Sequence, residues 1–168
     1  LSIEEQFYML FPALICILWK KYQQIPTKFI LVLVLAGVVF SHFSSMLKPI
    51  ASFYLIPTRA WELLFGCLVA VIELNYFEKM NHIRIRFRYI CELSLAIAVL
   101  LIFLSILFFD QHYTHPGIYT FFPCLATAII LLLASPQSKC CYLLRIKPLI
   151  GIGLISYSLY LWHQPIFA

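Results

Sequence analysis

Charged residues are scarce in this sequence: they make up 11% of its 168 residues, where about 25% is usual for a soluble domain. With a mean hydropathy of +0.94, this scarcity excludes a disordered tail and a nucleic-acid module that owes its basicity to a surface patch. A helix needs about 20 residues to cross a bilayer. The chain therefore predicts an all-α transmembrane bundle of about six spans, with membrane lipid and not nucleic acid as its surroundings.

The six cysteines show neither a CxxC pair nor the spacing of metal ligands. Four lie in apolar runs, and Cys140 and Cys141 are adjacent in the sequence. We interpret them as reduced, small hydrophobic residues. A lipidation or redox site at the vicinal pair, near the membrane surface, is the alternative.

Six apolar stretches are candidates for the spans, because the backbone of a segment in lipid must satisfy its own hydrogen bonds. They cover residues 6–19, 29–46, 59–72, 89–109, 117–135 and 149–168. Six prolines are expected in the links, where the missing amide donor does least harm; they are Pro26, Pro49, Pro57, Pro116, Pro136 and Pro148. We expect residues 1–168 to be one transmembrane domain, truncated at its N-terminus and within its last helix.

Basic residues alternate between the predicted links. The first link has three lysines or arginines, the third has four and the fifth has three, against one in the second and none in the fourth. Cytoplasmic loops carry such an excess, so we expect these three links on the cytoplasmic side of a plasma (inner) membrane that the chain crosses several times. The membrane topology then explains the net charge of +5.

Arg59 and Glu62 lie three positions apart in an apolar stretch, so a helix places them on one face, where they can pair. Ionisable residues inside a span usually face a bundle interior or an aqueous cavity, which makes both candidates for a functional site. Gly66, one turn beyond Glu62, leaves room on that face for a helix or a substrate. An interfacial ion pair that only sets the depth of the helix is the alternative.

Glu4 and Glu5 directly precede an aromatic and apolar stretch. A structural role explains them, because acidic residues in a first turn favour the helix dipole, and Ser2 with Glu5 has the spacing of a capping box. The functional alternative is that one carboxylate orients a base or accepts a hydrogen bond from a substrate hydroxyl. The spacing does not choose between these roles.

The last apolar stretch contains Tyr157, Tyr160, Trp162 and His163. An interfacial aromatic belt explains most of the aromatic residues. An imidazole inside a span needs a partner, so His163 is a candidate functional residue.

Two polar clusters lie in the predicted links. Residues 110–115 contain an aspartate and two histidines, for which a solvated loop is a simpler interpretation than a metal site, and we expect no metal. Three arginines alternate with apolar residues over residues 84–88. They are placed to line a cytoplasmic lip where a phosphorylated donor or an anionic lipid docks, although ordinary charge bias explains them equally well.

Three motifs occur in order: SIEEQFYMLFP over residues 2–12, FYLIPTRAWELLFG over 53–66 and ISYSLYLWHQP over 155–165. They resemble the Ser-Leu-x-x-Glu-Glu-Gln-Phe-Tyr, Arg-x-Trp-Glu and Ser-Tyr-x-x-Tyr-Leu-Trp-His-x-Pro segments of the acyltransferase 3 family of integral membrane acyltransferases. The first lacks the family's leading Trp. Because three motifs in the family's order cover nearly the whole chain, the resemblance is specific.

The resemblance implies a ten-helix bundle that takes an acyl group, expected to be acetyl, from acyl-CoA in the cytoplasm and delivers it to a hydroxyl of a cell-envelope glycan. This chain resembles the C-terminal six helices. The family's presumed catalytic His, with its preceding Arg, and its Arg-x-x-Arg motif have no counterpart here, so we expect the isolated chain to be inactive. The catalytic candidates carried over by motif are Arg59, Glu62, Glu4, Glu5 and His163, and the substrate-binding candidates are Tyr8, Trp61, Tyr157 and Tyr160.

Two other classes of function stay open. A transporter or a proton or ion conductor would use the buried Glu, Arg and His as a relay, but it is expected to show paired broken helices or an inverted repeat, and the sequence shows neither. A scaffold without catalysis predicts that replacing Arg59 or Glu62 changes the abundance of the protein but no product.

Overall fold

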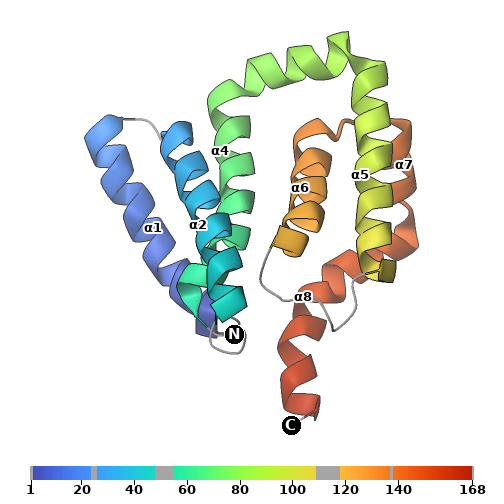
Figure 1. Cartoon of the computed structure of the whole chain (residues 1–168). Helices are drawn as coiled ribbons and strands as arrows, with labels where there is room; N and C mark the ends of the chain where they lie inside the picture. The colour runs from blue at the N-terminus through green and yellow to red at the C-terminus, as the bar shows by residue number, and fades with distance from the viewer. Residues whose placement is uncertain (1, 24–25, 48–54, 109–117, 137, 168) are drawn as a thin grey trace.

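The computed structural model describes residues 2–23, 26–47, 55–108, 118–136 and 138–167. The described residues are almost entirely helical and contain no strand, which confirms the predicted all-α class. Figure 1 shows the helices in chain order, which are α1 (Ser2–Tyr22), α2 (Thr27–Leu47), α4 (Ile56–Arg86), α5 (Arg88–Phe108), α6 (Ile118–Leu133), α7 (Lys139–Leu144) and α8 (Lys147–Phe167).

Within the described ranges, three helices are long and apolar enough to cross a membrane: α2, α4 and α5. The helix α6 is apolar over a shorter length, Tyr119–Leu133. The chain is therefore a membrane protein, and the count of six spans stays a prediction.

The predicted length of the third span, residues 59–72, is wrong. The helix α4 continues far beyond residue 72 and changes direction at Tyr76, whose backbone (φ −129°, ψ 27°) is not helical. Its second part, residues 77–86, which we call the arm, crosses one end of the bundle toward α5 (Figure 1). The arm is too polar to have been recognised as part of a span, so the sequence assigned it to a link.

Two further expectations about the links are wrong. Pro57 and Pro148 lie in the first turns of α4 and α8, where the absent N–H group would have no helical partner in any case. The short helix α7 was not predicted; Ser138 begins it by accepting a hydrogen bond from the Cys141 amide at 3.3 Å.

Basic residues of different helices lie at the same end of the bundle. In Figure 1 the end of α1, the beginning of α2, the arm, the beginning of α5 and the end of α6 lie together at the top. We call this the basic end, because Lys20 and Lys21 close α1 and Arg84 and Arg86 close α4 there. The beginnings of α4 and α6 lie at the opposite end, which places Arg59 and Glu62 there.

The closest helix packing is between α2 and α4. Ile30 and Val34 of α2 form the buried core with Leu68 and Val71 of α4. Gly37 allows the close approach: a Cβ atom at that position would lie 2.6 Å from the Cβ atom of Trp61. Small residues commonly permit such contacts between membrane helices.

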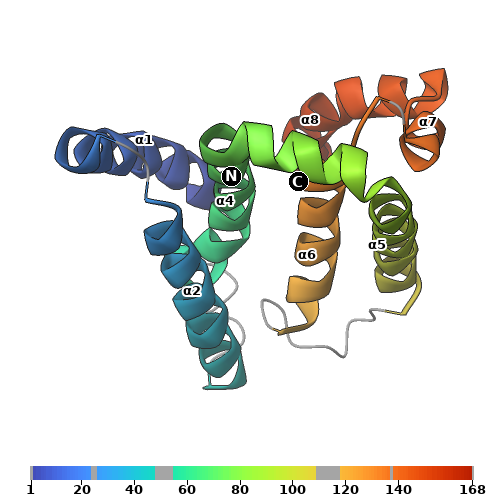
Figure 2. The ribbon, with the colours of Figure 1, turned by 90° about the horizontal axis from the view of Figure 1, so that it is seen from above.

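The helix α6 packs between α4 and α5, as Figure 2 shows from above. Phe65 of α4 and Phe121 of α6 meet edge to face, with ring centroids 5.8 Å apart. By contrast, α8 makes few contacts with the rest of the described chain, and its large apolar side chains from Leu149 to Tyr160 are exposed.

The basic end is expected to face the cytoplasm, and single cysteines in a Cys-free full-length background test this. A cysteine replacing Arg86 on the arm should be shielded from an impermeant thiol reagent in intact cells. A cysteine replacing Leu47, which is exposed at the opposite end of α2, should be labelled. Labelling at position 86 together with protection at position 47 would show the reverse orientation.

Candidate functional site

Arg59 and Glu62 form the ion pair that their spacing predicts. Nη2 of Arg59 lies 3.6 Å from Oε2 of Glu62, in the first turns of α4. The Arg59 side chain is 37% exposed and that of Glu62 is 20% exposed. At this distance and exposure the pair contributes little to stability. Its guanidinium group remains accessible to a substrate.

A cavity of about 250 Å³ opens beside Glu62, between α4 and α6. We call it the membrane cavity. Glu62 is the one charged group among its lining residues, and Gly66 contributes the space that a larger side chain would fill. The other lining residues are Phe65, Val69, Pro123, Cys124, Thr127, Ala128 and Leu131. A mostly apolar cavity with a single carboxylate at its edge suits a small uncharged group such as an acyl chain.

The four substrate-binding candidates are not among the residues that line this cavity. Trp61 is fully buried on the side of α4 that meets Gly37, and its indole Nε1 has no hydrogen-bond partner among the described residues. Tyr8 is exposed on α1, and Tyr157 and Tyr160 lie on α8. None of the four lines the membrane cavity, so their roles stay predictions.

The side chains of several predicted site residues are not described. The backbones of Glu4, Glu5 and His163 belong to α1 and α8, but their side chains are not described. The link of residues 110–115, which carried the weak metal-site pattern, lies outside the described residues. Among the described residues, no group of three His, Cys, Asp or Glu could hold a metal ion.

His42 is a polar residue of α2 that the sequence analysis did not single out. Its Nδ1 is buried and has no hydrogen-bond partner among the described residues. Ser45, one turn further, donates to the His42 carbonyl oxygen at 2.8 Å. The signal that points to His42 is a lone imidazole in an apolar stretch, the same signal that drew attention to His163.

Arg84 joins three parts of the basic end. Its Nη2 donates to Oε2 of Glu73 at 2.7 Å and to the Leu132 carbonyl oxygen at 2.6 Å, and its Nε donates to the same oxygen at 2.9 Å. The carbonyl groups of a last helical turn lack partners within the helix, and Leu132 is in the last turn of α6. Arg84 therefore fastens the arm to α6. It is 11% exposed, whereas the sequence placed it on an open lip.

Glu92 of α5 holds the beginning of α7. Its carboxylate accepts hydrogen bonds from the Lys139 amide at 2.8 Å, the Cys140 amide at 3.2 Å and the Ser138 hydroxyl at 3.1 Å. Carboxylates are favoured at helix N-termini, where backbone amides lack partners.

Burial, the neighbouring Cys141 and Glu92 raise the pKa of the Cys140 thiol, which makes it a poor nucleophile at neutral pH.

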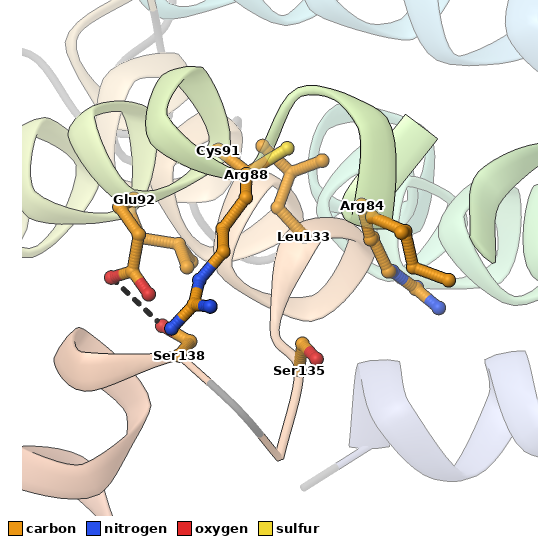
Figure 3. Close-up of a pocket in the computed structure, with 9 residues that line it drawn as sticks. Arg84, Arg88, Cys91, Glu92, Leu133, Ser135 and Ser138 are labelled. Atoms are coloured by element: carbon orange, nitrogen blue, oxygen red, sulfur yellow. Dashed lines mark hydrogen bonds between the residues drawn. The ribbon is translucent and has the colours of Figure 1, made fainter. Parts of the chain in front are cut away.

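A second hollow, of about 150 Å³, lies between the arm, α5 and the segment after α6. We call it the basic pocket. In Figure 3 the Arg88 side chain points toward Ser138 and Glu92, and Arg84 lies on the other side of Leu133. Two guanidinium groups, two serine hydroxyls and one carboxylate thus surround a pocket at the predicted cytoplasmic end.

Comparison with known proteins supports the resemblance. The family model described as an acyltransferase domain, acyltransferase 3, matches residues 1–168. The chain belongs to the acyltransferase 3 family. Its relatives include the peptidoglycan O-acetyltransferase OatA of Listeria monocytogenes, 30% identical over 173 residues, and the O-acetyltransferase OatA of Staphylococcus aureus, 32% identical over 174 residues. The putative peptidoglycan O-acetyltransferase YrhL of Bacillus subtilis is 26% identical over 172 residues.

These matches cover 99% of this chain but 27% to 28% of each relative. The chain therefore spans little more than a quarter of the length of the curated relatives that it matches. No solved structure matches the chain.

For a member of the acyltransferase 3 family, the membrane cavity has suitable chemistry. Acyl transfer needs hydrogen-bond donors for the negative charge that develops on the carbonyl oxygen and a site that excludes bulk water. The Arg59 guanidinium carries such donors, and its partner Glu62 lines the cavity. The two residues lie on one helix at fixed spacing, which keeps this geometry precise.

Replacing Glu92 by alanine is expected to release the beginning of α7. The Lys139 and Cys140 amides lose their acceptor, so their hydrogen exchange in the full-length protein should become much faster. Glu92→Gln should fall between, because its amide oxygen still accepts but carries no charge. Glu78→Ala, an exposed site on the arm, is the matched control. Unchanged exchange in Glu92→Ala would show that α7 does not depend on this carboxylate.

Proposed function

We propose that this chain is part of a membrane O-acetyltransferase that moves an acetyl group from acyl-CoA to a hydroxyl of an envelope glycan. The family and the names of its relatives support acetyl as the group and peptidoglycan as the glycan. The observation that carries the proposal is the ion pair of Arg59 with Glu62, because Glu62 lines the membrane cavity and the pair lies near the end of the bundle opposite the basic residues.

In this proposal, the hydroxyl oxygen of the glycan attacks the thioester carbonyl carbon. The new C–O bond forms, the C–S bond breaks, and CoA leaves as its thiol with the proton that a general base removes from the hydroxyl. Arg59 donates hydrogen bonds to the carbonyl oxygen as it becomes negative, and Glu62 holds the guanidinium in position. The mostly apolar lining of the cavity disfavours water, which protects the thioester from hydrolysis.

The general base is proposed to lie outside this chain, where the family resemblance places its catalytic His. Glu4 or Glu5 would then position the acceptor hydroxyl, and His163 would support the reacting groups. Tyr8, Trp61, Tyr157 and Tyr160 would contact the substrates. These assignments rest on the family motifs.

The test uses the full-length protein in liposomes, with acetyl-CoA labelled in its acetyl group on one side and peptidoglycan fragments on the other. The expected result is release of CoA together with an equal amount of glycan ester. Ion flux across the liposomes without release of CoA would contradict the proposal and favour a conductor. Release of CoA without formation of glycan ester would show that the protein hydrolyses acetyl-CoA instead of transferring its acetyl group.

A further inference from the structure

Two separate hollows share a lining residue in the segment that joins α6 to α7. The basic pocket includes Ser135 in its lining, and so does a neighbouring hollow of about 310 Å³ between that segment and α7. This second hollow is lined on its far side by Arg145, whose Nη1 donates to the Pro136 carbonyl oxygen at 3.3 Å. We call the two hollows together the arginine groove.

Positive charge borders the groove from three separate elements. Arg84 comes from the arm, Arg88 begins α5, and Arg145 directly follows α7. Ser135 lines both hollows, and Ser138 lines one of them with its hydroxyl donating to Glu92. Such a set of donors suits phosphate oxygens, because a planar guanidinium group can donate two parallel hydrogen bonds to one phosphate.

One carboxylate also lines the groove and would repel an anion. The Glu92 carboxylate, however, is engaged by two backbone amides and the Ser138 hydroxyl at the beginning of α7. Its charge is thereby partly balanced by these donors. Arg84 is paired with Glu73 at 2.7 Å, so the remaining excess of positive charge at the groove comes from Arg88 and Arg145 against Glu92.

We infer that the arginine groove binds the phosphate groups of the donor's nucleotide end. The inference rests on the proposed function and adds a location for the donor. The groove lies at the basic end, the predicted cytoplasmic side, whereas the membrane cavity reaches toward the opposite end. A long ligand with a charged end and an uncharged arm matches this separation. An anionic lipid headgroup offers the same phosphate chemistry and is the alternative source.

Arg88 is the residue on which to test this inference. Arg84 also fastens the arm to α6, so its loss would disturb the fold. Arg86 is the matched control, because it lies on the same stretch, carries the same charge and lines neither hollow; its guanidinium carbon lies 5.9 Å from the centre of the Phe87 ring.

The experiment measures steady-state acetyl transfer by the full-length protein in neutral-lipid nanodiscs with two donors. Acetyl-CoA carries the nucleotide phosphates, and acetyl-pantetheine lacks them. Arg88→Gln is expected to raise the KM for acetyl-CoA about 10-fold or more and to leave kcat nearly unchanged, since the contact is remote from the reacting carbon. The rate with acetyl-pantetheine should not change. Arg86→Gln should leave the kinetics with both donors unchanged.

Three results would overturn the inference. Equal effects of Arg88→Gln on both donors would show a structural role for Arg88. Equal effects of Arg88→Gln and Arg86→Gln would show general surface charge. An unchanged KM of Arg88→Gln for acetyl-CoA, together with loss of the stabilisation of the protein by added phosphatidylglycerol, would show that the groove binds a lipid headgroup. In all three cases turnover of acetyl-CoA by the parent protein would leave the proposed function standing, and its absence would refute that function separately.

Discussion

Arg59→Lys is expected to lower acetyl transfer by the full-length protein by about 100-fold or more, close to the loss in Arg59→Ala. Removing one donor to a developing oxyanion typically costs a factor of 10² to 10³ in rate. An ammonium group is a point charge and cannot reproduce the planar fork that binds both Glu62 and a carbonyl oxygen. The measurement is the initial rate of glycan ester formation, normalised to the amount of protein in the membrane.

The distance and exposure of the pair distinguish a loss of catalysis from a loss of stability. A buried pair would be destabilised by about 3 to 5 kcal/mol on losing one partner, but these side chains are 37% and 20% exposed and lie 3.6 Å apart. Exposed pairs contribute less than about 1 kcal/mol. Membrane abundance should therefore stay near that of the parent protein in both Arg59 variants.

Glu62→Gln provides the second arm of a double-mutant cycle. It keeps the shape of the side chain but removes the charge that orients Arg59, so activity should fall more than abundance does. Because both residues are proposed to act as one unit, the double variant should lose less than the product of the two single losses. Full activity in Arg59→Lys, or strictly independent losses, would leave only an ion pair that sets helix depth.

The helices that carry the membrane-facing apolar stretches could be predicted from the sequence. Each long apolar run has a helix at its centre, because lipid leaves the backbone no other partner. The arm and α7 could not be predicted in this way. The arm is polar, and α7 has only six residues. Their positions depend on hydrogen bonds between residues more than ten positions apart, from Arg84 to the Leu132 carbonyl oxygen and from the Lys139 amide to Glu92.

The candidate site was predictable only in part, for a similar reason. The spacing of Arg59 and Glu62 on one helix determines that they can pair, and the structure shows that they do. The membrane cavity, however, needs the surface of α6, and no local pattern indicates which helix packs against Glu62. The burial of Trp61 likewise depends on a residue of another helix, Gly37 of α2.

Among the described glycines, Gly37 is expected to be the one whose replacement disturbs the fold most. In Gly37→Ala the new Cβ would lie 2.6 Å from the Cβ of Trp61 and 3.4 Å from its Cγ. Distances under 3.0 Å between such atoms do not persist, so α2 and α4 must separate. Overpacking of this kind costs about 1 to 3 kcal/mol. Gly37→Leu should exceed that range, and we expect little of the full-length protein in the membrane.

Gly66→Ala is the matched control, because a Cβ there would meet no atom within 4 Å. The measurement is the unfolding midpoint of each full-length variant in a denaturing detergent titration, together with its membrane abundance. Gly37→Ala should unfold at a clearly lower detergent fraction than Gly66→Ala, which should match the parent protein. The clash involves the Cβ of Trp61 itself, so Trp61→Phe should not rescue Gly37→Ala. Rescue by Trp61→Phe, or equal midpoints for the two glycine variants, would show that α2 and α4 are not held together at this contact.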